Sequence, residues 1–162
     1  MWLSRLIVVL VAGMLTACTG LSVTPLGTDF ANESLRVAVI ETGGRNGQIY
    51  SRALRSLLGG DADPVFTLSS ELSVASSSTL TVRGSSSNLT KRSMTAKITL
   101  VDSATGETVM SDSISESSTV GTVSSYYAQT RSDKHSDERT SLLLAERVAA
   151  RVHLFFLDSK GQ

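Results

Sequence analysis

The stretch FTLSSELSVASSSTLTVR, residues 66–83, decides the fold that this sequence predicts. Because successive side chains of a strand point to opposite faces of a sheet, strict alternation of apolar and polar residues predicts a strand with one buried face. The odd-numbered positions here are mostly Ser, Thr, Glu or Arg, and we expect a β-bulge near the serines at 76–78. The large apolar residues are all even-numbered: Phe66, Leu68, Leu72, Val74, Leu80 and Val82.

A second run, residues 91–100, repeats this alternation after a short loop, with Lys, Ser or Thr at the odd positions. The two runs should therefore pair as an antiparallel hairpin. The turn DSATG, residues 102–106, ends in a glycine that tolerates positive φ and leads to a third strand over 107–120, so that the three strands form a meander. The even, apolar positions of the second run are Met94, Ala96, Ile98 and Leu100.

A first helix is predicted over residues 48–58, following a short strand at 35–40. Apolar side chains recur there at helical spacing, and Gly59 with Gly60 supplies a C-terminal stop. The solvent-exposed side of this helix is expected to carry Arg52 and Arg55. Its apolar face is expected to comprise Ile49, Ala53 and Leu57, with Tyr50, Leu54 and Leu58 on the adjoining rows.

A second helix is predicted to begin at Ser136, which supplies an N-cap followed by acidic residues in the first turn. The preceding residues 121–133 have no clean period and predict a loop. We expect four helix side chains to pack on the even-numbered strand face at Leu68, Leu72, Ile98 and Leu100. Those four are Leu142, Ala149, Val152 and Phe156.

The order of these elements, strand, helix, three strands and helix, predicts an α+β fold. Helices segregated to one face of an antiparallel sheet form two layers around one core. We therefore predict a two-layer sandwich: a mostly antiparallel sheet of about four strands with two helices on one face.

The chain opens with MWLSRLIVVLVAGMLTAC, residues 1–18, in which one early Arg precedes a short apolar run and small residues lead to Cys18. The run is shorter than the roughly 20 apolar residues that span a bilayer, so it predicts a secretory signal peptide. Cys18 is the only cysteine of the chain. A plain alternative is that Cys18 is a small residue ending a signal or core helix. Because Leu15-Thr16-Ala17-Cys18 resembles the bacterial lipobox, which implies a lipid on the cysteine, the expected boundaries are 1–17 for the signal peptide, 18–33 for a lipidated Cys and tether, and 34–162 for a single α+β domain.

Charge and cysteine usage narrow the classes of function. The chain carries 15 basic and 15 acidic residues, which gives no electrostatic reason for a nucleic-acid partner. With Cys18 acylated, no thiol remains for a disulfide or a cysteine-ligated metal. We predict no catalytic residues, no metal ligands and no cofactor. An enzyme is the alternative to a binding protein: a hydrolase that uses a Ser with His153 and Asp158. We disfavour it because no nucleophile motif lies near these residues.

Several short motifs, taken in order, resemble a known family. Leu15-Thr16-Ala17-Cys18 resembles the bacterial lipobox, which implies a diacylglyceryl thioether on Cys18, and Thr19 in place of Asp looks like outer-membrane retention. The whole order is similar to the LPS-assembly lipoprotein LptE family of alphaproteobacteria, from which the bulky residues 154–157 depart. The further motifs are Thr24-Pro25-Leu26-Gly27, an Arg-bearing first helix, the Ser/Thr strand pair, the turn 102–106 leading to Val109, Ser124-Ser125-Tyr126-Tyr127, and Ala145-Glu146-Arg147 in the closing helix.

The resemblance implies a non-enzymatic outer-membrane lipoprotein that plugs and helps assemble the LptD β-barrel and binds lipopolysaccharide (LPS) on its way to the cell surface. An auxiliary lipoprotein of another envelope system, a lipid transporter or a secretin pilot, stays open. Because LPS carries phosphates, we expect its site at the cations near the hairpin end, Arg83, Lys91, Arg92 and Lys97. These charges alternatively serve only to keep a strand edge soluble.

Overall fold

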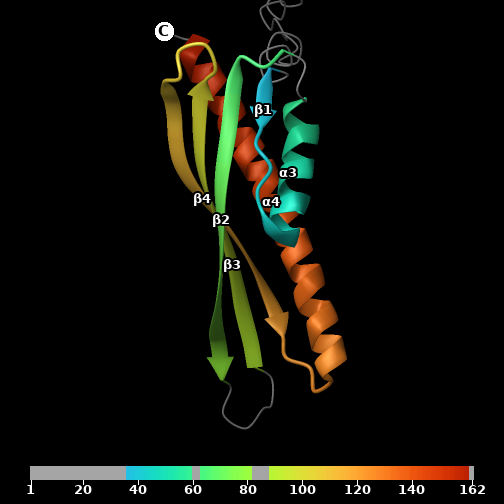
Figure 1. The fold of residues 1–162 in the computed structure, drawn as a ribbon. Coiled ribbons are helices and arrows are strands. Elements are labelled where there is room, and N and C mark those ends of the chain that lie inside the picture. Colours follow the sequence, from blue (N-terminus) through green and yellow to red (C-terminus); the bar gives the residue numbers. More distant parts are fainter. Residues whose placement is uncertain (1–35, 60–62, 82–87, 161–162) are drawn as a thin grey trace, which may run out of the picture.

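Four strands and two helices form a two-layer sandwich in the computed structural model, which describes residues 36–59, 63–81 and 88–160 (Figure 1). The sheet order is β1-β2-β3-β4; β1 runs parallel to β2 and the other neighbours are antiparallel. Both helices lie on one face, so the predicted fold class is confirmed. The elements are β1 Val37–Val39, α3 Gly44–Leu58, β2 Phe66–Thr81, β3 Asn88–Asp102, β4 Thr108–Gly121 and α4 Tyr126–Lys160.

The register confirms the predicted hairpin and the parity of its buried face. Leu68 stands opposite Leu100 and Leu72 opposite Ala96, and the pairing of β2 with β3 shifts between Ser78 and Leu80, next to the expected bulge. On β3 every even position from 94 to 100 is buried. The even positions of all three long strands therefore face the helices.

The turn between β3 and β4 is held by hydrogen bonds among its own residues. Asp102 Oδ1 accepts hydrogen bonds from the backbone N–H of Ala104 and Thr105, and the N–H of Gly106 donates to the Asp102 carbonyl at 2.8 Å. Gly106 has φ of 71°, which an L side chain would adopt only with strain. The predicted tight turn is confirmed.

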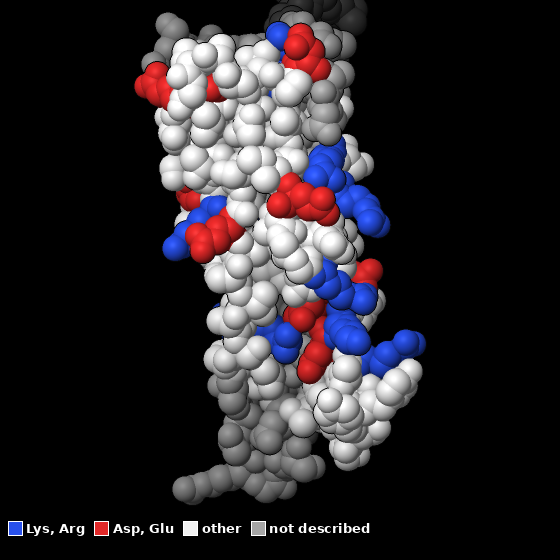
Figure 2. All heavy atoms as spheres, viewed as in Figure 1, with Lys and Arg blue, Asp and Glu red and all other residues white. Residues whose placement is uncertain are grey.

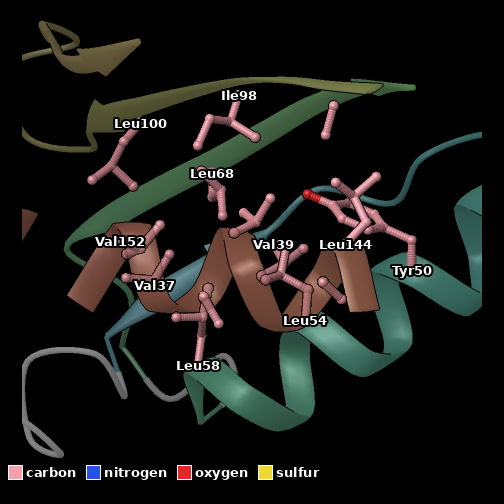
Figure 3. Packing of buried hydrophobic residues seen from close by; sticks show 14 of the residues in the cluster. Val37, Val39, Tyr50, Leu54, Leu58, Leu68, Ile98, Leu100, Leu144 and Val152 are labelled. Atoms are coloured by element: carbon pink, nitrogen blue, oxygen red, sulfur yellow. The ribbon is translucent and has the colours of Figure 1, made fainter. Parts of the chain in front are cut away.

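The first helix is rotated from the predicted orientation. Leu57 is 43% exposed, while Tyr50, Leu54 and Leu58 are fully buried and make its core contacts (Figure 3). Small residues on this side explain the rotation: a Cβ at Gly47 would lie 2.4 Å from the Thr42 carbonyl oxygen, so only glycine permits this approach. Arg55, expected on the wet side, is half-buried with Nε 3.4 Å from the Val39 carbonyl oxygen.

The second helix contributes most of the buried side chains above the sheet. Ala149, Val152 and Phe156 are buried as predicted, but Leu142 is 42% exposed, so that part of the prediction is wrong. The buried face of α4 passes through Ser141 and Leu144, and a residue directly after Ser141 lies about 100° further round the helix. On the strand side Leu72 is only partly buried, because it lies near the margin of the core.

The predicted loop over 121–133 is wrong for its second half, because α4 begins at Tyr126 and Ser136 lies inside it. This first part of the helix has no apolar stripe and is supported by polar contacts one turn apart. The Ala128 N–H donates to Ser125 Oγ at 3.5 Å, and Gln129 Nε2 donates to Asp133 Oδ1 at 2.9 Å. The first contact is an N-cap, which contributes about 1 kcal/mol, and the second is an i,i+4 side-chain pair, which contributes about 0.2–0.5 kcal/mol; both favour helix over loop.

Figure 1 shows that the described chain has two unlike ends. At the first, which we call the tether end, β1 begins and both helices end. At the second, the distal end, β2 and β4 finish and α4 begins. With 1.5 Å of rise per residue the 35 residues of α4 span about 52 Å, whereas α3 has 15 residues and covers only the half toward the tether end. Of the two described helices, only α4 therefore covers the distal half of the sheet.

One edge of the sheet is only briefly paired. The strand β1 pairs with Phe66, Thr67 and Leu68 of β2, and the Ile40 N–H adds one bond to the Leu68 carbonyl. Among the described residues no further strand pairs with the rest of that edge, and β4 forms the opposite edge. None of the described helices is long and apolar enough to cross a membrane.

Tyr50 gives the core a pH-dependent contact. Its hydroxyl lies 3.0 Å from Ser70 Oγ, and burial raises the pKa of this phenol to about 12, although the bond to Ser70 opposes the rise. A Tyr that ionises near 10 when unfolded and near 12 when folded lowers the stability as the pH rises through this interval. We expect the alkaline loss of stability to be smaller in Tyr50→Phe, at a cost of about 1 kcal/mol at neutral pH for the lost bond. Urea unfolding at pH 7, 10 and 11.5 measures both effects; equal alkaline losses in the two proteins would contradict this role.

Candidate functional site

The cations expected at the hairpin end do not lie on one face. Lys91 and Lys97 are exposed on the outer face of β3, where Lys97 stands opposite Glu71 of β2 and Lys91 opposite Ser77. Arg92 points to the other face, toward α4. Arg83 lies outside the described residues, as do Cys18 and the tether. Of the three described cations, only the two lysines share an open surface.

Arg92 is held by acids of the second helix. Its Nε and one terminal nitrogen each donate to Asp137 at 2.8 Å, and its other terminal nitrogen lies 3.9 Å from Asp133. The hydrogen bonds to Asp137 raise the pKa of Arg92 above its usual value. With side-chain exposures of 21% and 17%, Arg92 and Asp137 form a shielded bidentate pair. This geometry assigns Arg92 to the packing of α4 on the distal half of the sheet.

Removing this pair should loosen the distal half. Arg92→Ala leaves the shielded Asp137 carboxylate without its partner, and we expect it to cost about 2–3 kcal/mol. Urea denaturation measures the loss, and hydrogen exchange should show it concentrated in residues 126–140. The double variant R92M/D137L, which replaces the ions with apolar side chains, should recover most of the stability. An unchanged midpoint in Arg92→Ala would show that the pair contributes nothing.

A row of polar contacts continues between β4 and α4. Arg151 Nε donates to Asp112 Oδ2 at 2.7 Å, and this bond lowers the pKa of the Asp112 carboxyl. Arg147 Nε lies 2.7 Å from Glu116 Oε2, an ionic contact without good hydrogen-bond alignment. Nearer the distal end, the Thr140 hydroxyl donates to Ser118 Oγ at 3.0 Å. Together these contacts fix how α4 lies along β4.

The outer face of the sheet is a continuous surface of small hydroxyl side chains, which we call the hydroxyl face. Neither helix covers it, as the ribbon shows (Figure 1). Neighbouring hydroxyls bond to each other across strands, as Thr95 does to Ser115 at 2.8 Å. The hydroxyl face comprises Thr67, Ser69, Ser73, Ser77, Ser93, Thr95, Thr99, Ser111, Ser113, Ser115, Ser117 and Thr119.

The hydroxyl face was visible in the sequence as the polar, odd-numbered positions of the three strands, but it was not singled out there as a site. Its side chains are short, carry no formal charge and include no paired acid and base. Apart from the exposed Lys91, Lys97 and Glu71 it therefore offers hydrogen bonds and a flat shape. Chemically, such a surface suits contact with another polar protein surface.

Solved bacterial lipoproteins have a similar fold. A candidate lipoprotein from Caulobacter crescentus CB15 superposes with a TM-score of 0.64 at 13% identity, covering 78% of this chain and 94% of that one. Rare lipoprotein B from Shewanella oneidensis gives 0.58 at 12% identity, covering 76% and 96%. A minor lipoprotein from Acinetobacter baumannii gives 0.56 at 10% identity, covering 74% and 92%.

At these identities the likeness shows the fold alone. No family model matches the sequence, and no curated protein matches it either. The superpositions cover 92–96% of these three solved chains, so the likeness extends over nearly the whole of each compared fold.

Proposed function

We propose that this chain is an outer-membrane lipoprotein of LptE type, which plugs and helps assemble the LptD β-barrel and binds lipopolysaccharide during its transport to the cell surface. In this proposal it is not an enzyme and needs no cofactor. Two observations support an envelope lipoprotein: the lipobox pattern ending at Cys18, and a fold that solved bacterial lipoproteins share.

The observation that carries the plug proposal is the uncovered hydroxyl face. A sheet that buries one side and leaves the other bare normally exposes mixed charged and polar residues, whereas this one exposes mostly Ser and Thr. The lumen of an outer-membrane barrel is polar, and a plug must contact it without exposing apolar surface or unpaired charge. Apart from Glu71, Lys91 and Lys97, the flat layer of hydroxyls satisfies both conditions, because each hydroxyl donates and accepts and excludes little volume.

Lys91 and Lys97 fit the binding of lipopolysaccharide in this arrangement. Both project from the hydroxyl face, where a polyanionic ligand passing along the barrel wall would meet them. Arg92 is not proposed as a contact of the ligand, because its guanidinium is occupied by Asp137 and Asp133. Arg83 stays a proposed contact from the sequence.

Co-purification from detergent-solubilised membranes tests the proposal. The tagged lipoprotein should bring down a large β-barrel, identified by mass spectrometry. The double variant S113R/S117R, which places two bulky cations on the hydroxyl face, should no longer bring down the barrel, although its thermal unfolding midpoint should not change. Ser56→Arg, a control on the exposed side of α3, should still bring down the barrel.

Two outcomes would reject the plug. Recovery of inner-membrane transporter subunits or of a secretin in place of the barrel would favour the alternative, an auxiliary lipoprotein of that system. Recovery of the barrel by S113R/S117R at the level of the unmodified protein would show that the hydroxyl face is not the contact.

A further inference from the structure

A basic groove lies on the helix side of the molecule, away from the hydroxyl face. It has a volume of about 560 Å³ and is formed where the first turn of α3 meets the first half of α4. Figure 2 shows Lys and Arg side chains gathered on this side of the molecule, with a few acids among them. The groove is lined by Arg45 from α3 and by Arg131, Ser132, Lys134, His135 and Glu138 from α4.

The groove has a net positive charge because most acidic residues in the first half of α4 lie on the opposite side of the helix. Asp133 and Asp137, the acids of this segment that do not line the groove, turn toward the sheet and contact Arg92. Glu138 is the only acid in the lining, and it lies 3.8 Å from Arg45. Three basic side chains also line the groove, Arg45, Arg131 and Lys134, so the lining has more basic than acidic side chains.

The start of α3 adds to this field. The N-cap position is Gly43, no side chain caps the first turn, and the first turn holds no acid. A Cβ built on Gly43 or Gly44 would meet nothing within 4 Å, so the backbone there is open. The positive end of a helix with unsatisfied N–H groups favours an anion, here on the same side as the cations.

An exposed tyrosine next to the groove narrows the class of ligand. Tyr127 is 71% exposed at the start of α4, and the guanidinium of Arg131, which lines the groove, lies 5.8 Å from its ring centroid. Amphipathic rings of this kind suit the boundary between a polar headgroup and an apolar body.

We infer that this groove binds phosphate groups, and that Arg45, Arg131 and Lys134 are the residues that hold them. Arginine forms bidentate bonds to phosphate oxygens and lysine adds a mobile charge. The exposed ring of Tyr127 beside Arg131 favours a phosphate carried by an amphiphile over a free phosphate ion. The site stands on its own geometry and does not require the barrel; that it would receive the phosphates of lipopolysaccharide is a consequence that rests on the proposed function.

Calorimetric titration of the full chain in nonionic detergent tests the inference with two probes: phosphatidic acid in mixed micelles and inorganic pyrophosphate. We expect R45E/K134E to weaken binding of phosphatidic acid roughly tenfold or more, because each charge-assisted contact is worth a substantial fraction of such a change. The matched control R36E/R52E carries the same change of charge, and both residues lie outside the groove; it should bind within roughly twofold of the unmodified protein. Circular dichroism checks that the fold of R45E/K134E is intact. R45Q/K134Q, which removes the two charges without reversing them, repeats the test with a milder change.

The possible results of these titrations distinguish a specific site from general attraction by charge, and an amphiphile from a free phosphate. Equal losses in R45E/K134E and R36E/R52E would show attraction by net charge and overturn the groove as a site, as would unchanged binding in both. Pyrophosphate bound as tightly as phosphatidic acid, with the same loss in R45E/K134E, would keep the phosphate site and overturn the preference for an amphiphile. Because none of these titrations contains the barrel, they can fail or succeed independently of the co-purification.

Discussion

Ile98→Asp is expected to cost about 4 kcal/mol or more and to leave the chain largely unfolded at 37 °C. Ile98 is 1% exposed in the third strand of the sheet, among the apolar side chains of the core, and an unpaired carboxylate there would lose its hydration without gaining a partner. The residue opposite it on β4 is Asp112, so the new charge would also be repelled. Since domains of this size are stable by only about 5–15 kcal/mol, one such change removes much of the total.

The neighbouring position supplies the control. Thr99 is on the outer face of the same strand, half-exposed, so Thr99→Asp should cost no more than about 1 kcal/mol. Urea unfolding followed by circular dichroism measures both. A larger loss in Thr99→Asp than in Ile98→Asp would invert the assignment of the two faces.

Cys18→Ala is expected to abolish lipidation, and with it the lipid anchor, completely. The lipobox resemblance assigns both acyl chains of the diacylglycerol to this thiol, and each buried methylene contributes about 0.8 kcal/mol to membrane binding. Labelled palmitate should be incorporated into the unmodified protein and absent from the variant, which should keep its signal peptide or appear in the periplasm.

A change at the next residue separates lipidation from sorting. Thr19→Asp should keep the label and move the protein from outer to inner membrane fractions, if the usual sorting rule applies. Label in the Cys18→Ala protein would rule out the lipobox interpretation, whereas an unmoved Thr19→Asp protein would rule out only the sorting rule.

The parity of the strands was predictable because the odd-numbered, solvent-exposed positions are nearly all polar, and most of them are serine or threonine. With apolar residues at 94, 96, 98 and 100 and hydroxyls or lysines between them, a slip of one residue would expose the whole core face. The register, the meander and the burial of the even positions all follow from that pattern. No comparable rule fixed the rotation of α3, because its two neighbouring rows are both apolar, and the close approach of Gly47 to Thr42 decides between them.

The start of α4 and the role of Arg92 were hidden for a different reason. Residues 126–135 have no apolar stripe, so the helix there depends on polar contacts that periodicity does not detect. Consequently Arg131 was assigned to the predicted loop, and Lys134 lay between this loop and the predicted helix. That both line one groove with Arg45 was not predicted. The even number of Arg92 already indicated the helix side, but its partner Asp137 is 45 positions away in the sequence.

The brief pairing of β1 leaves a risk of misassembly that this chain must manage. Beyond Leu68 one edge of β2 has no partner strand among the described residues, and β4 forms a second edge of 14 residues. Long free edges promote sheet-to-sheet association and fibril growth, especially in flat apolar strands. Here Glu71 stands on the outward face of β2, and most of the other outward residues of the two edge strands are serines or threonines, so a second copy would gain little apolar burial at either edge. The same composition that makes the sheet suitable as a contact surface therefore keeps the free chain from polymerising.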